Sequence, residues 1–264
     1  MQPFSRSDFG AATHSWTQCE VQALPDAVAE TLAREIAADI VRQRTLGAPS
    51  LYARWTAALN GTPLDAEAVR LLPIYLEPGF GTRPSPSTDT LTQATVAEHL
   101  WHVAMNDPRT QRTLILVTKP KLYTTGPGGD GLVVFRDQQL FFELWEIKKY
   151  KGNSPAKAAR RGTQQLSANA ARYLVEHSDI GQTRSDPTEQ EFFARLVPMW
   201  LDGEPNARAG VCIASSIASA RCFDVLAQHF GHLTGVVPRT GLIFVVGDLP
   251  AFASRVLELL WTGR

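Results

Sequence analysis

Three residues, Asp130, Glu146 and Lys148, have the types and the spacing needed for chemistry at a metal ion. Side chains alternate along a strand, so Glu146 and Lys148 should share one face of the apolar segment 140–148. Two carboxylates brought together inside a fold repel each other and lose solvation, and a hard cation such as Mg²⁺ relieves both costs. A lysine on the same face could orient or deprotonate an attacking water and offset charge on a phosphate.

A hairpin should bring the two carboxylates together. The polar residues 136–139 separate two apolar runs, 132–135 and 140–148, as a turn separates paired strands. The residue numbers of two positions that pair across the hairpin should then add up to 275 or 276. This places Asp130 opposite residue 145 or 146. We therefore expect Asp130 and Glu146 at the same end of the hairpin.

The segment behind this hairpin is strongly basic. Residues 147–175 contain no Asp or Glu, although the formal net charge of the whole chain is zero. Ordinary exposed helices mix both signs, so the pattern favours a surface that binds phosphates without reading sequence. The basic residues are Lys148, Lys149, Lys151, Lys157, Arg160, Arg161 and Arg172.

An Asp, a gap of 15 residues and Glu-x-Lys on a strand followed by a helix resembles the PD-(D/E)xK nuclease superfamily. The resemblance covers about residues 90–174. Gly129 stands at the position of the proline that gives the PD-(D/E)xK motif its first letter. It implies a restriction-endonuclease-like α/β core, a mixed sheet flanked by helices, that uses Mg²⁺ or Mn²⁺. Asp130, Glu146 and Ile147 would be the metal-binding positions, and Lys148 would assist the water.

The same resemblance implies contributions from the two neighbouring helices. The helix before the strands often adds an acidic residue, for which Glu98 is the candidate. The helix after them often presents glutamine or basic residues, which here points to Gln164 or Gln165 and to Arg161.

A narrower similarity concerns the nuclease subunit of the Hachiman antiphage system, which works beside a helicase. It rests on Gly128-x-Asp130-Gly131, the hairpin, the Glu146, Lys148 and Tyr150 pattern, and a helix rich in small residues. It implies DNA cleavage in bacterial defence, with a helicase or another regulatory protein as partner. The alternatives are a restriction- or repair-type nuclease acting alone, and a catalytically silent nucleic-acid-binding protein with the same fold.

The rest of the chain predicts a tail and helical lobe over residues 1–88 and an α/β core over residues 89–264. The tail should reach Gln18, and residues 78–88 should form a loop. Further strands are expected at 113–118, 210–217 and 241–246. Helices are expected at about 25–47, 51–59, 65–72, 90–105, 154–176, 189–200 and 250–260.

Several function classes are disfavoured. Three widely spaced cysteines argue against a zinc site or a disulfide framework, and the glycines at 126–131 lack the Gly-Lys-Ser/Thr ending of a P-loop. No signal peptide or apolar stretch of membrane-spanning length is visible, so we expect a cytoplasmic protein without a membrane partner. Asp130, Glu146 and Lys148 also have a simpler interpretation without catalysis. Asp130 would then belong to a glycine-rich turn, and Glu146 and Lys148 would lie on a solvated strand face.

Overall fold

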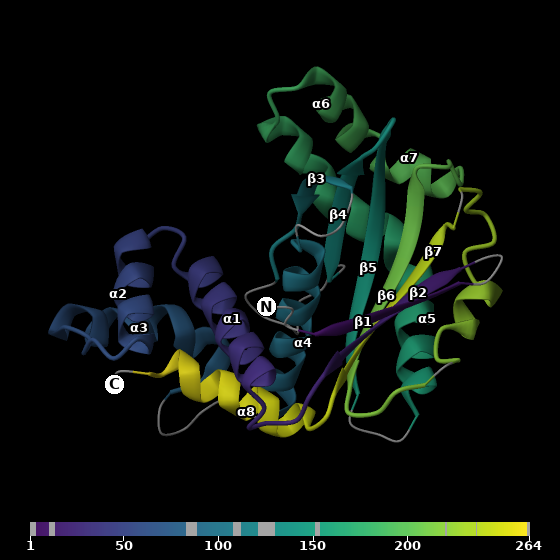
Figure 1. The fold of residues 1–264 in the computed structure, drawn as a ribbon. Helices are drawn as coiled ribbons and strands as arrows, with labels where there is room; N and C mark the ends of the chain where they lie inside the picture. The colour runs from purple at the N-terminus through teal and green to yellow at the C-terminus, as the bar shows by residue number, and fades with distance from the viewer. Residues whose placement is uncertain are drawn as a thin grey trace.

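The computed structural model describes residues 4–10, 14–82, 89–107, 112–120, 130–150, 154–219, 221–235 and 237–262. Within these residues, seven strands form one mixed sheet with helices on both faces (Figure 1). This confirms the predicted α/β class and the mixed sheet flanked by helices. None of the described helices is long and apolar enough to cross a membrane.

The sheet has the strand order β1-β2-β7-β6-β5-β4-β3. Its centre, from β2 to β5, is parallel, and β1, β4 and β3 run antiparallel to their neighbours. The strands are β1 (Ser5–Gly10), β2 (Ser15–Val21), β3 (Thr113–Val117), β4 (Gly131–Arg136), β5 (Leu140–Tyr150), β6 (Ala207–Ser215) and β7 (Arg239–Val246).

Most helices lie where the apolar periodicity predicts them. Asp26, Asp65, Asp186 and Asp248 cap four of them by accepting backbone N–H bonds. The helices are α1 (Ala27–Arg44), α2 (Pro49–Leu59), α3 (Ala66–Phe80), α4 (Asp89–Met105), α5 (Pro155–Ser178), α6 (Pro187–Ala194), α7 (Leu196–Leu201) and α8 (Leu249–Leu260), with short 3₁₀ turns at Asp179–Thr183 and Asp224–Gln228.

The predicted N-terminal tail is wrong. Residues 5–10 form β1 and residues 15–18 are the first part of β2, which pairs in parallel with β7, so that Ser15 lies opposite Thr240. The alternation expected of a strand is missing in β1, because all six of its residues are exposed. Strand β1 is held only by its pairing with β2, which in turn pairs with the distant β7.

Two predicted helix ends are also wrong. Helix α3 continues through Pro73 and Pro78 to Phe80, because Leu72, Leu76 and Phe80 are buried at helical spacing. The loop expected from residue 78 therefore begins later, and residues 83–88 lie outside the described part. The single helix expected at 189–200 is two helices, α6 and α7, which meet at Arg195.

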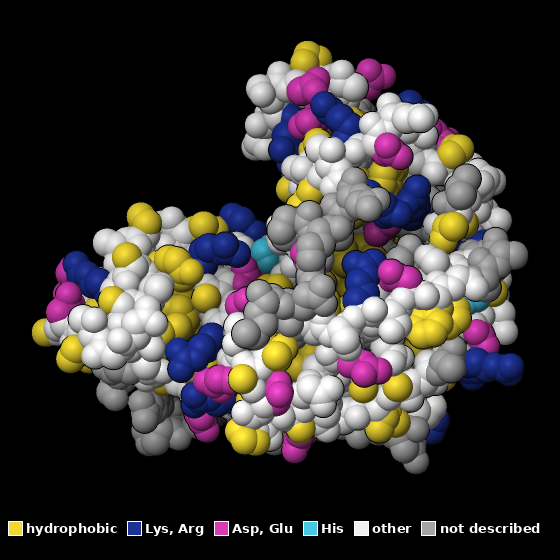
Figure 2. Space-filling view, viewed as in Figure 1, with side chains coloured by type: hydrophobic (Ala, Val, Ile, Leu, Met, Phe, Trp, Pro, Cys, Tyr) yellow, Lys and Arg dark blue, Asp and Glu magenta, His cyan; other side chains and the backbone are white. Residues whose placement is uncertain are grey.

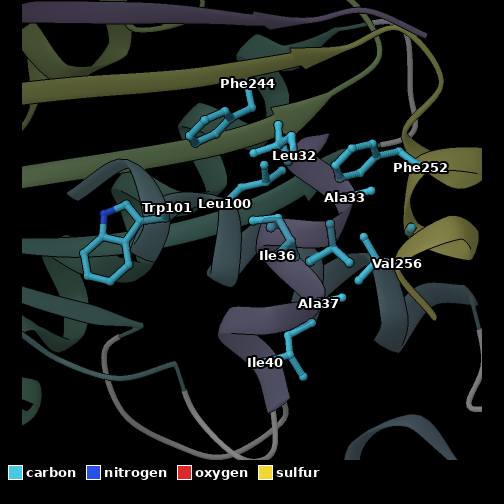
Figure 3. Close-up of a cluster of buried hydrophobic side chains, with 14 of the residues drawn as sticks. Leu32, Ala33, Ile36, Ala37, Ile40, Leu100, Trp101, Phe244, Phe252 and Val256 are labelled. Atoms are coloured by element: carbon cyan, nitrogen blue, oxygen red, sulfur yellow. The ribbon is translucent and has the colours of Figure 1, made fainter. Parts of the chain in front are cut away.

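One face of the sheet is covered by α1, α4 and α8. Helix α1 contributes Leu32, Ile36 and Ile40, which pack with Phe244 of β7 and Phe252 of α8 in one apolar cluster (Figure 3). A second cluster, on the opposite face, lies under α5, α6 and α7. The sheet thus separates two cores, each with its own set of helices.

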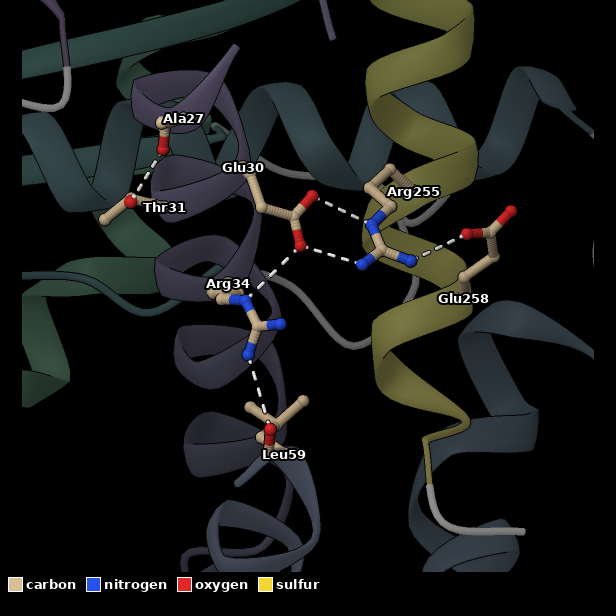
Figure 4. A network of polar contacts seen from close by, with 7 residues as sticks. All are labelled: Ala27, Glu30, Thr31, Arg34, Leu59, Arg255 and Glu258. Carbon is tan, nitrogen blue, oxygen red and sulfur yellow. Dashed lines mark hydrogen bonds and ion pairs between the residues drawn. The ribbon is translucent and has the colours of Figure 1, made fainter. Parts of the chain in front are cut away.

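Polar contacts fasten α1 to α8 (Figure 4). The Glu30 carboxylate accepts hydrogen bonds from Arg255 at 2.7 and 2.9 Å and from Arg34 at 3.3 Å. Arg255 also holds Glu258, and the bonds from the two arginines lower the pKa of Glu30. The indole of Trp55 donates to the carbonyl of Leu260 at 3.2 Å. The division of the chain at residue 88 stays a prediction, but these contacts cross it.

Candidate active site

The hairpin places Asp130 beside Glu146. Gly131 pairs with Trp145, so partner positions add up to 276, which is one of the two predicted registers. Asp130 directly precedes β4, and its Oδ2 accepts a hydrogen bond of 2.7 Å from the backbone N–H of Ile147. The carboxylate of Asp130 is therefore fixed against β5, next to the strand positions that carry Glu146 and Lys148.

Glu146 is completely buried, and its surroundings disfavour its charged form. Burial is the main reason why its pKa rises to about 8, and the negative charge of Asp130 raises it further. The ammonium of Lys148 contacts Oε1 and offsets part of this rise. The other oxygen, Oε2, is buried and accepts no hydrogen bond from a described N–H or O–H group, and a hydrogen bond between the Glu146 and Asp130 carboxyl groups adds to the rise of the pKa. A proton shared between the two carboxyl groups, or a cation bound to both, offsets the cost of this arrangement.

Helix α5 lies directly on this part of the sheet. A Cβ added at Gly162 would stand 3.1 Å from Val211, 3.5 Å from Cγ of Lys148 and 3.7 Å from Cγ of Glu146. The glycine thus permits a close approach that covers Glu146. The side chain of Lys148 keeps 22% of its surface exposed, so its ammonium can be reached from solvent.

The two glutamines predicted on α5 have different surroundings. Gln164 is exposed, whereas Gln165 is half-buried and hydrogen-bonds Tyr173. Burial raises the pKa of Tyr173, and the charges of Glu146 and Asp130 add to that rise, so its hydroxyl lies within electrostatic reach of the acidic pair. Sequence reasoning missed Tyr173. A usable signal was its place on the sheet-facing side of α5, which it shares with Gly162.

The exposed basic residues of α5 lie on more than one side of the helix. One side of α5 carries three basic residues and Gln165. The basic residues follow one another after about one and about three helical turns, and they are Lys157, Arg161 and Arg172. Arg160 is also exposed, and it is turned by about 100° around the helix axis from Arg161. Lys149, on β5, is half-buried, and Lys151 lies outside the described residues. We call Lys157, Arg161 and Arg172 the basic row.

Glu98 is buried, but its helix covers the other face of the sheet. Trp101, one turn later on α4, packs against Trp145, with 6.3 Å between ring centroids. The Trp101 ring also fills the space that a Cβ of Gly131 would need. The hydrogen bonds of the acidic pair come from Ile147 and Lys148 instead. A metal-binding role of Glu98 stays a prediction.

The acidic pair offers two carboxylates to a cation, and no group of three His, Cys, Asp or Glu side chains among the described residues is arranged to hold one. Mg²⁺ accepts one or two carboxylates when water and phosphate oxygens complete its shell. Oε2 of Glu146, which accepts no hydrogen bond from a described N–H or O–H group, could be a ligand in such a site. Ile147 could take part through its backbone carbonyl, since its N–H is engaged with Asp130.

Neither a protein-family model nor a curated protein sequence matches the chain. The functional conclusion therefore depends on the geometry and chemistry of the site itself. The central feature is a buried carboxylate beside a second carboxylate and a lysine, at the end of a hairpin and under a basic helix.

Proposed function

We propose that this protein is a metal-dependent nuclease with a PD-(D/E)xK-type centre. The observation that carries the proposal is Glu146, a fully buried carboxyl group with a raised pKa, held in contact with both Asp130 and Lys148. A buried group that destabilises the apo fold is expected where a ligand repays the cost. The simpler interpretation, a solvated strand face, does not fit a Glu146 that is fully buried.

Each residue then has a definite task. Asp130 and Glu146 hold the cation, and the N–H of Ile147 keeps the Asp130 carboxylate oriented. Bound Mg²⁺ or Mn²⁺ would supply the positive charge that polarises a phosphodiester. Lys148 is close enough to Glu146 to orient a water or to stabilise charge on the phosphate. Gly162 lets α5 cover the pair and limit access of bulk water.

The substrate class follows from the charges on α5. The basic row is exposed and lies on the helix that covers the acidic pair, which suits a nucleic-acid backbone, and we propose DNA. We further propose antiphage defence as the setting, with a helicase or another protein controlling the nuclease. That part depends on the resemblance of the hairpin to the Hachiman nuclease subunit.

The proposal is tested by incubating the purified chain with supercoiled plasmid, single-stranded DNA and RNA in Mg²⁺, Mn²⁺ or EDTA. Cleavage should require the metal, and Lys148→Ala should reduce it by about 100-fold or more, because it removes a positioned charge near the reacting phosphate. Calorimetry should show that Lys148→Ala still binds Mn²⁺ while Asp130→Asn binds it more weakly.

Arg195→Ala is the matched control, since Arg195 is an exposed cation of the α6–α7 junction that pairs with Glu204. It should cleave at the parental rate. Cleavage by Lys148→Ala at that same rate would show that Glu-x-Lys is an accident of spacing. A parent that binds nucleic acid but neither binds Mn²⁺ nor cleaves any of the three substrates would be a catalytically silent binding protein.

A further inference from the structure

Helix α4 contacts α1 on one side and the central strand β5 on the other. Trp101 of α4 is completely buried and packs against Trp145 of β5. In Figure 3 its ring points away from Leu32 and Ile36 of α1. The ring of Trp101 therefore belongs to the sheet side of α4.

The ring of Trp101 rests on Gly131, the residue next to Asp130. A Cβ built on Gly131 would lie 2.6 Å from Cζ2 and 2.7 Å from Cζ3 of Trp101, far inside van der Waals contact. Gly131 does not have a positive φ, so its backbone would accept alanine, and the Trp101 ring is the nearest obstacle. The ring thus determines how the chain enters β4.

The position of Asp130 depends on this entry, because its carboxylate extends the hairpin by one hydrogen bond. Gly131 and Trp145 form the terminal pair of the ladder between β4 and β5. Beyond that pair, Oδ2 of Asp130 accepts the N–H of Ile147. A shift of Gly131 would move Asp130 and break this bond. The N–H of Ile147 therefore reports whether Asp130 is in place.

The opposite side of α4 is held by one buried carboxylate of α1. Oδ2 of Asp39 accepts hydrogen bonds from Nδ1 of His99 at 2.7 Å and from Nδ1 of His102 at 2.9 Å. All three side chains are buried, and Oδ1 of Asp39 pairs with Arg42. Burial alone would raise the pKa of Asp39, but the bonds from His102 and His99 lower it far below its usual range. The carboxylate is therefore charged.

The contacts of Asp39 determine how α4 is rotated. His99 and His102 are about one turn apart on a side of the helix roughly opposite to Trp101. Nε2 of His102 is left to accept a hydrogen bond from Asn106 at 3.3 Å. A charged acceptor forms stronger hydrogen bonds than a neutral one, so Asp39 resists a rotation that would lift Trp101 from Gly131.

We propose that Trp101 is a positioning residue for Asp130, and that Asp39 holds Trp101 in place through the two histidines. The role of Asp130 as a metal ligand rests on the proposed function, whereas the contacts do not. Figure 2 shows a notch between the surface of α1–α3 and that of α6, so the helices next to α4 are open to a partner. A partner that moved α1 would shift Asp130 through α4 and so alter metal binding.

The test is amide hydrogen exchange of the metal-free full chain, measured by NMR as the rate for Ile147 divided by the rate for Phe244. Phe244 lies in β7, which is paired on both sides, so overall destabilisation does not raise this ratio. Trp101→Phe should raise the ratio by about 10-fold or more, because the shorter ring no longer supports Gly131 and the charged hydrogen bond is lost. Trp55→Phe shortens another fully buried indole and is the control that should not raise it.

Gly131→Ala tests the same contact from the other side. The added methyl group would displace the Trp101 ring and should also raise the exchange ratio by about 10-fold. In the double variant of Gly131→Ala and Trp101→Phe, the methyl group would occupy the space that the shorter ring leaves. Its ratio should be below that of either single variant, since two changes compensate in this way only where the residues touch.

Asp39→Asn tests the other side of α4. It keeps the size of the side chain but removes its charge, and it should raise the ratio by about 3-fold or more. Asp26→Asn, at the N-cap of the same helix α1, is the control that should not, because asparagine caps a helix as well as aspartate does.

Parental exchange ratios in both Trp101→Phe and Gly131→Ala would overturn the role of Trp101. A parental ratio in Asp39→Asn would overturn the role of Asp39. Raised ratios in these variants, together with a parent chain that binds no Mn²⁺, would support the positioning contacts and contradict the nuclease proposal.

Discussion

At the scale of single residues, buried Glu146 lowers the stability of the native state at the candidate site. Its pKa of about 8 means that the native state keeps the proton to a higher pH than the unfolded chain, whose glutamates titrate near 4.5. Native and unfolded states are both protonated below about pH 4.5. Above it only the unfolded chain releases the proton, so stability falls as pH rises and the full penalty is present above about pH 8.

Glu146→Gln should therefore stabilise the metal-free protein in a pH-dependent manner. Each pKa unit corresponds to about 1.4 kcal/mol, so the gain should reach several kcal/mol at pH 8.5 and should fall to about 1 kcal/mol or less at pH 5. Thermal melts in EDTA at both pH values measure it. Glu191→Gln, an exposed position on α6, should show no such difference. A melting-temperature gain of equal size at both pH values would contradict the raised pKa.

The convergence of Asp130, Glu146 and Lys148 could be predicted because it depends only on local rules. Alternation along one strand and a three-residue turn determine which side chains meet. The neighbours that depend on helix packing could not be predicted in this way. Sequence spacing does not distinguish Gln164 from Gln165 or select Tyr173, because the choice depends on how α5 is rotated against β5.

At the scale of elements, α5 combines two functions on different sides. One side packs on the sheet, and the basic row of Lys157, Arg161 and Arg172 lies on an exposed side. Replacing the three row residues by Gln should make the salt dependence of DNA binding shallower by about 2–3 in log–log slope, since each phosphate that is no longer neutralised lowers the slope by about 0.9. Fluorescence anisotropy between 50 and 300 mM NaCl measures the slope.

Two neighbouring residues provide the matched comparison. Arg160 and Arg161 have the same charge and exposure class but point to different sides of α5. Arg161→Gln should flatten the slope by about one, and Arg160→Gln should have a smaller effect. Equal effects would show that the whole helix surface contacts DNA, and no effect from either would show that α5 faces away from it.

The elements that sequence reasoning missed are those made by partners far along the chain. Strand β1 is fully exposed, and β2 is mostly half-buried with only Cys19 and Val21 buried, which gives little apolar pattern. Helix α3 contains two prolines that ordinarily end a helix, and buried Leu76 and Phe80 outweigh them. Helices with a clear buried stripe, such as α1 and α8, were predicted correctly because their pattern is local.

At the scale of the whole molecule, the N-terminal strands should be essential to the fold. Removing residues 1–21 deletes β1 and β2, uncovers β7, and exposes part of the core that Cys19 and Val21 help to bury. A loss of several kcal/mol is expected, at about 1.5–3 kcal/mol for each large buried apolar side chain. Soluble yield and thermal melts measure this effect.

Removal of residues 1–10 alone is the control, because it deletes β1 and leaves β2 as the edge of the sheet. This shorter truncation should lower the melting temperature by much less. If both truncated chains melt at the parental temperature, the first strands contribute nothing to stability, and residues 1–21 would behave as the tail that the sequence suggested.

The pairing of Ser15 with Thr240 also determines when the protein can fold. A chain leaving the ribosome exposes β2 long before β7 has been synthesised, so the edge of β2 that pairs with β7 stays unpaired for nearly the whole of translation. Loop closure over such a distance is slow, and an unpaired strand can meanwhile pair with another chain. The exposed and largely polar β1 pairs with the other edge of β2, and we expect it to lower the tendency of this hairpin to aggregate before β7 is synthesised.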